Sequence, residues 1–120
     1  MTPTEVVQAF YAAGTGADVD KLAGFFAEDA VWDNRIDDDP MGGLYEGRDG
    51  IHSGLLGPLF QFLPQGIRTE IERIIESENT VVCLNTGRGT TVQGQPFEKR
   101  YAHIFEVADD RIVRITEFRS

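Results

Sequence analysis

Two stretches of the sequence carry side chains that could do acid–base or positioning chemistry. The first is AVWDNRIDDDP, residues 30–40, in which Asp33 and Asn34 are followed by a run of acids at Asp37–Asp39. The second is PFEKRYAHIFEV, which contains His103. Histidine is suited to general acid or base catalysis because its unperturbed pKa lies near neutrality. The alternative for His103 is a core histidine that is hydrogen-bonded to a neighbour.

The residues of the first stretch also have two interpretations. Asn34 could position a water molecule or a carbonyl group, with Asp33 beside it in a ligand-binding site. Alternatively, both residues could cap a turn, because Asn and Asp hydrogen-bond to their own backbone. The acids at Asp37–Asp39 repel one another, which favours a hydrated loop at the rim of a site. We predict no metal site, because the chain has two histidines and lacks a calcium-loop pattern.

Helices are predicted in the first half of the chain. Thr2 and Glu5 have the spacing of a capping box in front of an apolar stripe, and this helix is expected to end near Gly14. A second, shorter helix capped by Asp18 is predicted for DVDKLAGFFAEDA. The segment RDGIHSGLLGPLFQFL has helical spacing, but its glycines and proline predict a weak, bent helix.

Strands are predicted after Pro64, where the apolar period changes to two. A segment beginning at Ile67 is followed by TVVCLNTGRGTTV, PFEKRYAHIFEV and RIVRITEFR, with tight turns between them, which indicates an antiparallel meander. Upstream, AVW predicts a short strand, and residues 34–50 are expected to be irregular apart from a pairing at Leu44–Tyr45. Helices followed by strands predict an α+β fold, with the helices on one face of a curved sheet.

The alternation of the PFEKRYAHIFEV strand predicts where His103 points. Successive residues of a strand face opposite sides, so Tyr101, His103 and Phe105 share the apolar face that the helices cover. We therefore predict that these three residues line an internal cavity together with Trp32 and Phe60. In the last strand both faces are mixed in polarity, so the pattern does not decide which face is buried.

Length and composition predict one domain over residues 1–120. Hydrophobic residues make up 41% of the chain and charged residues 26%, which are ordinary values for a globular protein. The net charge of -9 argues against nucleic acid and against an anionic membrane surface as partners. A single cysteine fits a reducing compartment, and neither a signal-peptide pattern nor an apolar run of membrane-spanning length is visible. We predict a soluble cytoplasmic protein.

The chain resembles the SnoaL-like and ketosteroid-isomerase-like group of the nuclear-transport-factor-2-like superfamily over nearly its whole length. The resemblance is carried, in this order, by VVQAFYAAGTGADVDKLAGFFAEDAVW, YEGRDGI, GQPFEKRYAHIFEV and DRIVRITEF. It implies a cone-shaped, curved antiparallel or mixed sheet wrapped around N-terminal helices, a cystatin-like α+β barrel with a ligand pocket inside. It does not specify a reaction, because the superfamily contains isomerases, cyclases, epoxide hydrolases, dehydratases and binding proteins. Dimers are common among its members.

Ketosteroid isomerases give one residue-by-residue comparison. Their catalytic Asp, which follows the first short strand, matches Asn34 in this chain. The Tyr of their oxyanion hole matches Phe10, with Tyr11 adjacent, and the protonated Asp of that hole matches His103. The combination of an Asp base with a Tyr and a protonated Asp, on which those isomerases depend, is therefore not retained. A steroid isomerase of that mechanism is not expected, although Tyr11 remains a candidate for ligand binding.

Limonene-epoxide-hydrolase-like proteins give a second comparison. Their Tyr-x-Asn motif matches Trp32 and Asn34, and their Arg-x-Asp pair falls on Thr86 and Arg88. The Asp of their last strand matches Glu117. The resemblance therefore implies a polar pocket in which Glu117 and Arg88 form a clamp and Thr86 contacts the ligand. The alternative for Glu117 and Arg88 is a structural ion pair that closes the sheet.

Two functions remain open at this point. The first is an acid–base enzyme of the isomerase, cyclase or hydrolase type, without a cofactor, acting on a small apolar molecule that contains a ring. His103 would be its acid or base, Glu117 with Arg88 its clamp, and Asn34 a positioning amide. The second is a non-catalytic dimeric protein that binds a small hydrophobic ligand in the same pocket. In both cases we expect a homodimer formed through the outer face of the sheet.

Overall fold

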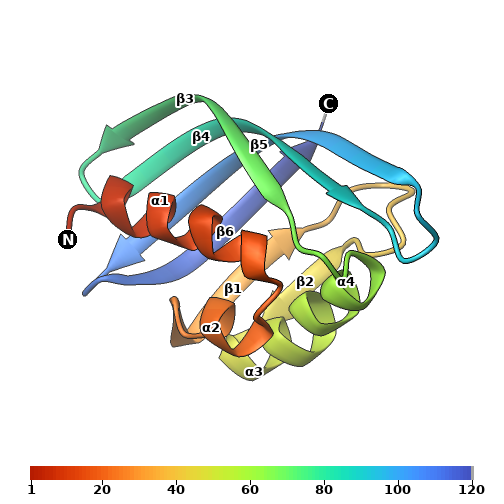
Figure 1. The fold of residues 1–120 in the computed structure, drawn as a ribbon. Helices are drawn as coiled ribbons and strands as arrows, with labels where there is room; N and C mark the ends of the chain where they lie inside the picture. The colour runs from red at the N-terminus through yellow and green to blue at the C-terminus, as the bar shows by residue number, and fades with distance from the viewer. Residues whose placement is uncertain (120) are drawn as a thin grey trace.

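The structure is a computed structural model and describes residues 1–119. In this part of the chain one curved sheet wraps around the first helix, and the remaining helices close one end of the sheet (Figure 1). The elements in chain order are α1 (Pro3–Ala13), the short 3-10 helix η1 (Gly14–Gly16), α2 (Val19–Ala23), β1 (Phe26–Asn34), β2 (Gly43–Glu46), α3 (Gly47–Ile51), the π-helical turn η2 (His52–Leu56), α4 (Gly57–Phe62), β3 (Arg68–Ser77), β4 (Thr80–Thr90), β5 (Pro96–Ala108) and β6 (Arg111–Arg119).

The sheet has the strand order β2-β1-β6-β5-β4-β3 within the described residues. Strands β3 to β6 form the antiparallel meander that the turn positions predict. Strand β1 runs parallel to β6, and β2 pairs antiparallel with β1, so the sheet is mixed. The predicted α+β class with a curved mixed sheet around N-terminal helices is confirmed.

The two N-terminal helices begin at the predicted residues. The Thr2 hydroxyl accepts a hydrogen bond from the backbone N–H of Glu5, and the Glu5 carboxylate accepts one from the N–H of Thr2 at 2.8 Å. Asp18 caps α2 by accepting from the N–H of Lys21. Such caps satisfy N–H groups that have no partner within the helix.

The predicted extent of the second helix was wrong. Helix α2 ends at Ala23, and β1 begins at Phe26, where a helix was expected to continue to Ala30. Phe26 is completely buried and lies opposite Ile112 of β6. A short apolar run fits a helix or a strand equally well, and here pairing with the last strand decides in favour of the strand.

The segment between β2 and β3 is helical from Gly47 to Phe62, close to the helix expected for residues 48–63. The expectation that residues 34–50 are irregular was wrong for its last residues, which form α3. Its middle part is the π-helical turn η2, and the hydroxyl of Ser53 there donates to the carbonyl of Asp49 at 2.8 Å. Leu55 and Leu56 of this turn are buried against the rest of the molecule. The expected pairing at Leu44–Tyr45 is present as strand β2.

The core lies between α1 and the concave face of the sheet. The ring of Phe10 on α1 packs against Phe26, Trp32 and Phe105, with ring centroids 5.6 to 6.1 Å apart. These contacts fix α1 against β1 and β5, and so place Tyr11 of α1 beside the polar residues of the sheet described below. None of the helices in residues 1–119 has the length and apolar character needed to cross a membrane.

Candidate active site

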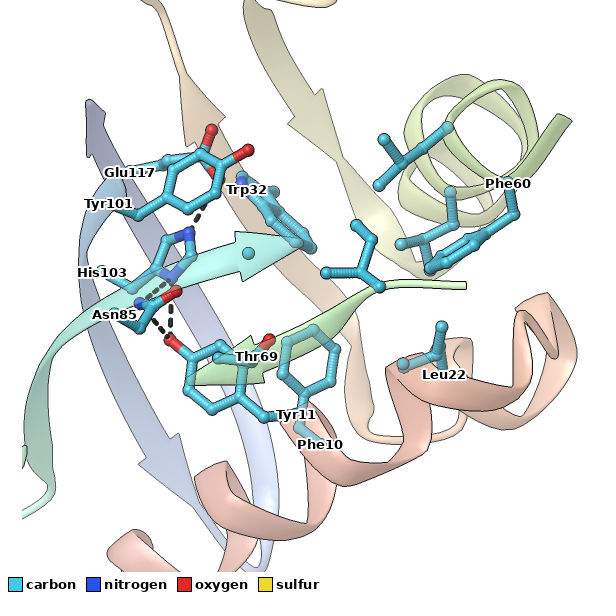
Figure 2. Close-up of a pocket in the computed structure, with 15 residues that line it drawn as sticks. Phe10, Tyr11, Leu22, Trp32, Phe60, Thr69, Asn85, Tyr101, His103 and Glu117 are labelled. Carbon is cyan, nitrogen blue, oxygen red and sulfur yellow. Dashed lines mark hydrogen bonds and ion pairs between the residues drawn. The ribbon is translucent and has the colours of Figure 1, made fainter. Parts of the chain in front are cut away.

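A cavity lies between α1, the helices at the end of the cone and the concave face of the sheet (Figure 2). This inner cavity is small, with a volume of about 80 Å³, and it is partly open to solvent. Its walls are largely aromatic and aliphatic. The helical segments contribute Phe10, Tyr11, Gly14, Leu22, Leu56, Leu59 and Phe60, and strands β1, β3, β4, β5 and β6, with Ile67 just before β3, contribute Trp32, Ile67, Thr69, Asn85, Gly87, Tyr101, His103 and Glu117.

Four of the five residues predicted to line one cavity do so: Trp32, Phe60, Tyr101 and His103. Phe105 does not border it. This residue is fully buried in the core beneath the cavity, and its ring lies 5.8 Å from the imidazole of His103 and 5.6 Å from the ring of Tyr11. The alternation of β5 put Phe105 on the correct face, but the strand continues past the end of the cavity, so Phe105 supports the site without lining it.

His103 is held by hydrogen bonds at both ring nitrogens. Its Nε2 lies 2.8 Å from Oε1 of Glu117 on the neighbouring strand β6. Its Nδ1 lies 2.7 Å from the hydroxyl oxygen of Tyr11 and 3.0 Å from Nδ2 of Asn85. Figure 2 shows these four side chains as a connected chain along one wall of the cavity. All four residues are buried.

The donors around Nδ1 assign the tautomer of His103. Burial raises the pKa of Tyr11 far above its usual value, so the phenol keeps its proton and can donate it to Nδ1. The amide of Asn85 also donates, both to Nδ1 and to the Tyr11 oxygen at 3.1 Å. With Nδ1 as an acceptor, the ring N–H is on Nε2 and is donated to Glu117.

This arrangement leaves Glu117 as the group that can reach a ligand. Both nitrogens of His103 are occupied by protein partners, whereas Oε1 is the single Glu117 oxygen with a hydrogen bond to another of the described residues. Glu117 also borders a second space, the outer cavity. The carboxylate thus lies at the junction of the two cavities, with one oxygen oriented by His103 and the other available.

The outer cavity lies beyond Trp32 and Tyr101 and is mainly apolar. It shares Trp32, Leu59, Tyr101 and Glu117 with the inner cavity; the rest of its wall is formed by Asn34, Asp39, Pro40, Met41, Leu55, Pro58, Phe62, Phe97 and Lys99. Asn34 is 4% exposed and donates a long hydrogen bond of 3.5 Å to the carbonyl of Met41. The predicted positions of Trp32 and Asn34 in the pocket walls therefore agree with the structure.

Arg88 and Thr86 are not part of either cavity. Asn85 and Gly87 of β4 face the inner cavity, so alternation turns Thr86 and Arg88 to the outer face of the sheet. There the guanidinium of Arg88 binds Glu70 at 2.9 Å and Glu98 at 3.4 Å. The expected clamp between Arg88 and Glu117 was therefore wrong, as was the expected contact of Thr86 with the ligand.

Asp33 also points away from the cavities. Its carboxylate binds Arg35 at 2.8 Å and Arg114 of β6 at 3.1 Å on the outer face of the sheet. The hydrogen bond from Arg35 is the main reason that the pKa of Asp33 is held below its usual value. Trp32 and Asn34 face inward on the same strand, so Asp33 between them must face outward, and its expected role in ligand binding was wrong.

The acidic run divides into two parts. Asp37 and Asp38 are exposed, as expected for a hydrated rim loop. Asp39 is different, because its side chain is 9% exposed and binds Arg119 at 2.8 Å beside the outer cavity. It closes the rim loop against the end of β6. No group of three metal-ligating side chains is found in residues 1–119.

The sequence interpretation missed Asn85, although a signal was present. This amide interrupts the apolar segment VVCLN of β4, is 1% exposed, and connects Tyr11 to His103. A buried amide in the middle of a strand requires hydrogen-bond partners, which marks it as part of a polar network. Cys83, two residues earlier, is a buried free thiol on the same inner face.

We expect the raised pKa values of Tyr11 and Tyr101, both caused mainly by burial, to make the protein sensitive to alkali. Unfolded tyrosine loses its proton near pH 10, whereas these two keep theirs in the folded state, so unfolding releases protons. Stability is therefore full below about pH 10, and above it each tyrosine lowers the free energy of unfolding by about 1.4 kcal/mol per pH unit. Urea unfolding of the wild type and Tyr11→Phe between about pH 9 and 11 measures this. The variant should lose stability less steeply; parallel curves would contradict the expectation.

Comparisons with known proteins agree with this fold. A family model described as a SnoaL-like domain matches residues 7–115. No curated protein matches the sequence significantly. Among solved structures, a protein from Catenulispora acidiphila with a ketosteroid isomerase-like fold, in complex with trimethylamine, is 21% identical and superimposes with a TM-score of 0.82; the match covers 100% of this chain and 88% of that one.

Two further structures have the same architecture. A cystatin-fold protein from Novosphingobium aromaticivorans is 25% identical with a TM-score of 0.78, and the match covers 99% of each chain. SalBIII, described as an epoxide hydrolase/cyclase-like enzyme in pyran ring formation in the polyether salinomycin, is 14% identical with a TM-score of 0.81. That match covers 98% of this chain and 90% of SalBIII. Similarity at this level establishes a shared fold.

Proposed function

Because this chain belongs to the SnoaL-like family, we propose that it is an acid–base enzyme, working without a cofactor, on a small apolar molecule that contains a ring. The observation that carries the proposal is the carboxylate of Glu117 at the junction of two apolar cavities, with one oxygen bound by the buried chain of His103 and Tyr11. A carboxylate in such surroundings has a fixed direction and little competing water, which general acid–base catalysis requires.

In this proposal Glu117 exchanges the proton with the substrate, and His103 is a positioning residue. The imidazole borders the inner cavity, but it has no nitrogen free to exchange a proton with a substrate while Glu117 occupies Nε2 and Tyr11 and Asn85 occupy Nδ1. Its Nε2 instead hydrogen-bonds to one carboxylate oxygen of Glu117 and fixes the rotamer of that side chain. These roles replace the expectation that His103 itself is the acid or base.

The reaction classes that fit are isomerisation, cyclisation and hydrolytic ring opening, each of which needs a positioned base or acid. SalBIII shares the fold and is described as epoxide hydrolase/cyclase-like, which supports including these classes. The test is incubation of the protein with epoxides, enones and polyketide-like rings, followed by product analysis by mass spectrometry. Conversion that depends on Glu117 is expected for at least one of these classes.

A second function is supported by one observation, the complete hydrogen bonding of His103 by protein groups. A histidine with no free nitrogen is also what a purely structural role requires, as in a protein that binds a small hydrophobic ligand without converting it. Tight binding of compounds from all three classes, with none of them converted, would favour this second function over catalysis.

We also propose a homodimer formed through the outer face of the sheet. Leu84, Ala102 and Phe118 form one apolar row across three strands there, and Ile75 and Val82 lie in the next row. Phe118 is 55% exposed and Ile75 is 46% exposed, which is unusual for large apolar side chains on one face. Light scattering at a protein concentration of roughly tens of micromolar should report twice the monomer mass. The Phe118→Arg variant should report the monomer mass under the same conditions. A wild-type monomer under these conditions would contradict the proposal.

The remaining expectations about partners and location are kept as proposals. The net charge of -9 supports a small molecule rather than nucleic acid or an anionic membrane as the partner. Cys83, buried and unpaired within the described residues, is compatible with the reducing conditions of the cytoplasm, where we propose that the protein works.

A further inference from the structure

Two buried polar atoms on β1 have no hydrogen-bond partner within the described residues. They are Nε1 of Trp32 and Oδ1 of Asn34, and their residues are 7% and 4% exposed. Both side chains lie on the inner face of the strand. Trp32 borders both cavities, and Asn34 borders the outer one. Nearly all buried polar groups in folded proteins are paired, so two unpaired groups on one cavity wall indicate that a partner comes from outside the protein.

The chemistry required of that partner differs between the two atoms. The indole N–H of Trp32 is a donor only, so it requires an acceptor such as a ketone, ether or epoxide oxygen. The unpaired atom of the Asn34 side chain is its carbonyl oxygen. The backbone carbonyl of Met41 can only accept a hydrogen bond, so the group that donates to it is the NH₂ of the Asn34 amide. This oxygen requires a donor, and in a largely apolar chamber a neutral hydroxyl is the least costly one to bury.

Resting on the proposed function, we propose that the substrate class is a ring molecule that carries an acceptor oxygen, held by Trp32, and a hydroxyl group, held by Asn34. The Cα atoms of residues two apart on a strand are separated by roughly 7 Å. The acceptor oxygen and the hydroxyl of the ligand therefore belong on opposite sides of its ring system. The surrounding wall, which includes Leu59, Phe62 and Phe97, contacts the rings. Neither polar atom has exposed surface, so the proposal requires side chains of the wall to move as the ligand binds.

The hydroxyl requirement is tested by calorimetry with 6-hydroxy-1-tetralone, 6-methoxy-1-tetralone and 1-tetralone, which share one ring system. The hydroxy compound should bind about tenfold more tightly than the other two, the usual size of one added hydrogen bond. Asn34→Leu, which has a similar volume and removes an unpaired polar atom, should fold normally and bind all three compounds equally. Equal affinities on the wild-type protein, or no measurable binding of any compound, would overturn the proposal without use of the variant.

The acceptor requirement is tested by NMR, because Trp32 is the single tryptophan in the chain. Its indole N–H gives one resonance, which should move downfield when saturating 1-tetralone is added and should not do so with tetralin, which lacks the ketone. A bound ketone without this shift would overturn the role of Trp32. These two experiments measure binding, so they are independent of turnover. If the tetralones bind with the expected preferences but none of the epoxides, enones and polyketide-like rings is converted, the proposed catalysis is disproved and this inference stands.

Discussion

Glu117→Gln is expected to lower kcat by about a hundredfold or more on any substrate that the enzyme converts, the usual contribution of a general acid or base. Glutamine keeps the shape of the side chain and can still hydrogen-bond to Nε2 of His103, but it has no proton to exchange at neutral pH. The cavity walls are unchanged, so substrate affinity should change little. Steady-state kinetics give kcat, and calorimetry on the same variant gives the dissociation constant.

The matched control for this prediction is Asp38→Asn, which makes the same change from acid to amide in the exposed rim loop. Its activity should be close to that of the wild type, because a hydrated carboxylate has no positioned proton to transfer. His103→Ala should also lower kcat strongly, since Glu117 loses the hydrogen bond that fixes the direction of its carboxylate. If Asp38→Asn abolished activity and Glu117→Gln did not, the active site would lie in the rim loop instead.

Phe105→Ala is expected to lower the free energy of unfolding by about 3–5 kcal/mol, the range for removing a buried aromatic ring. Phe105 is completely buried, and its ring packs edge-on against Phe10, Tyr11 and His103. The cavity left by the ring would lie directly beneath the hydrogen-bonded chain of the site. Chemical denaturation followed by circular dichroism measures the loss, and the midpoint should fall without a large change in slope.

The same substitution at an exposed phenylalanine provides the comparison. Phe62 on α4 is 42% exposed and makes an aromatic contact with Phe97. Phe62→Ala should therefore cost well under half as much stability as Phe105→Ala, because less apolar surface is removed from the interior. Equal losses at the two positions would show that Phe105 is not the centre of the packing that supports the site.

Several features of the protein follow from the sequence alone because their causes are local. The capping box at Thr2 and Glu5 depends on residues three positions apart, and the structure contains it. The meander follows from strand periods and the turns between them. The alternation of β5 assigns Tyr101 and His103 to the covered face, because successive side chains of a strand point to opposite sides. Such regularities need no knowledge of which segment lies beside which.

Other features depend on contacts between distant segments, and only the tertiary structure decided them. The polarity of β6 is mixed, so the inward direction of Glu117 follows from its register with β5, where His103 lies opposite Glu117 and Phe105 opposite Ile115. The comparison with related proteins placed Arg88 and Thr86 in the pocket, but on β4 Asn85 and Gly87 take the inward positions. A shift of one residue reverses every side chain of a strand, and hydrophobic pattern cannot resolve that shift where both faces are mixed.

The chain of Tyr11, Asn85, His103 and Glu117 is the clearest case of this division. The sequence determined that a histidine faces the helices, because that property belongs to one strand. It could not determine that both nitrogens of this histidine would be occupied, since the partners come from α1, β4 and β6 and lie 92, 18 and 14 residues away along the chain. Hydrogen bonding depends on distances of a few tenths of an ångström between such segments, which only the packing of α1 into the curved sheet sets.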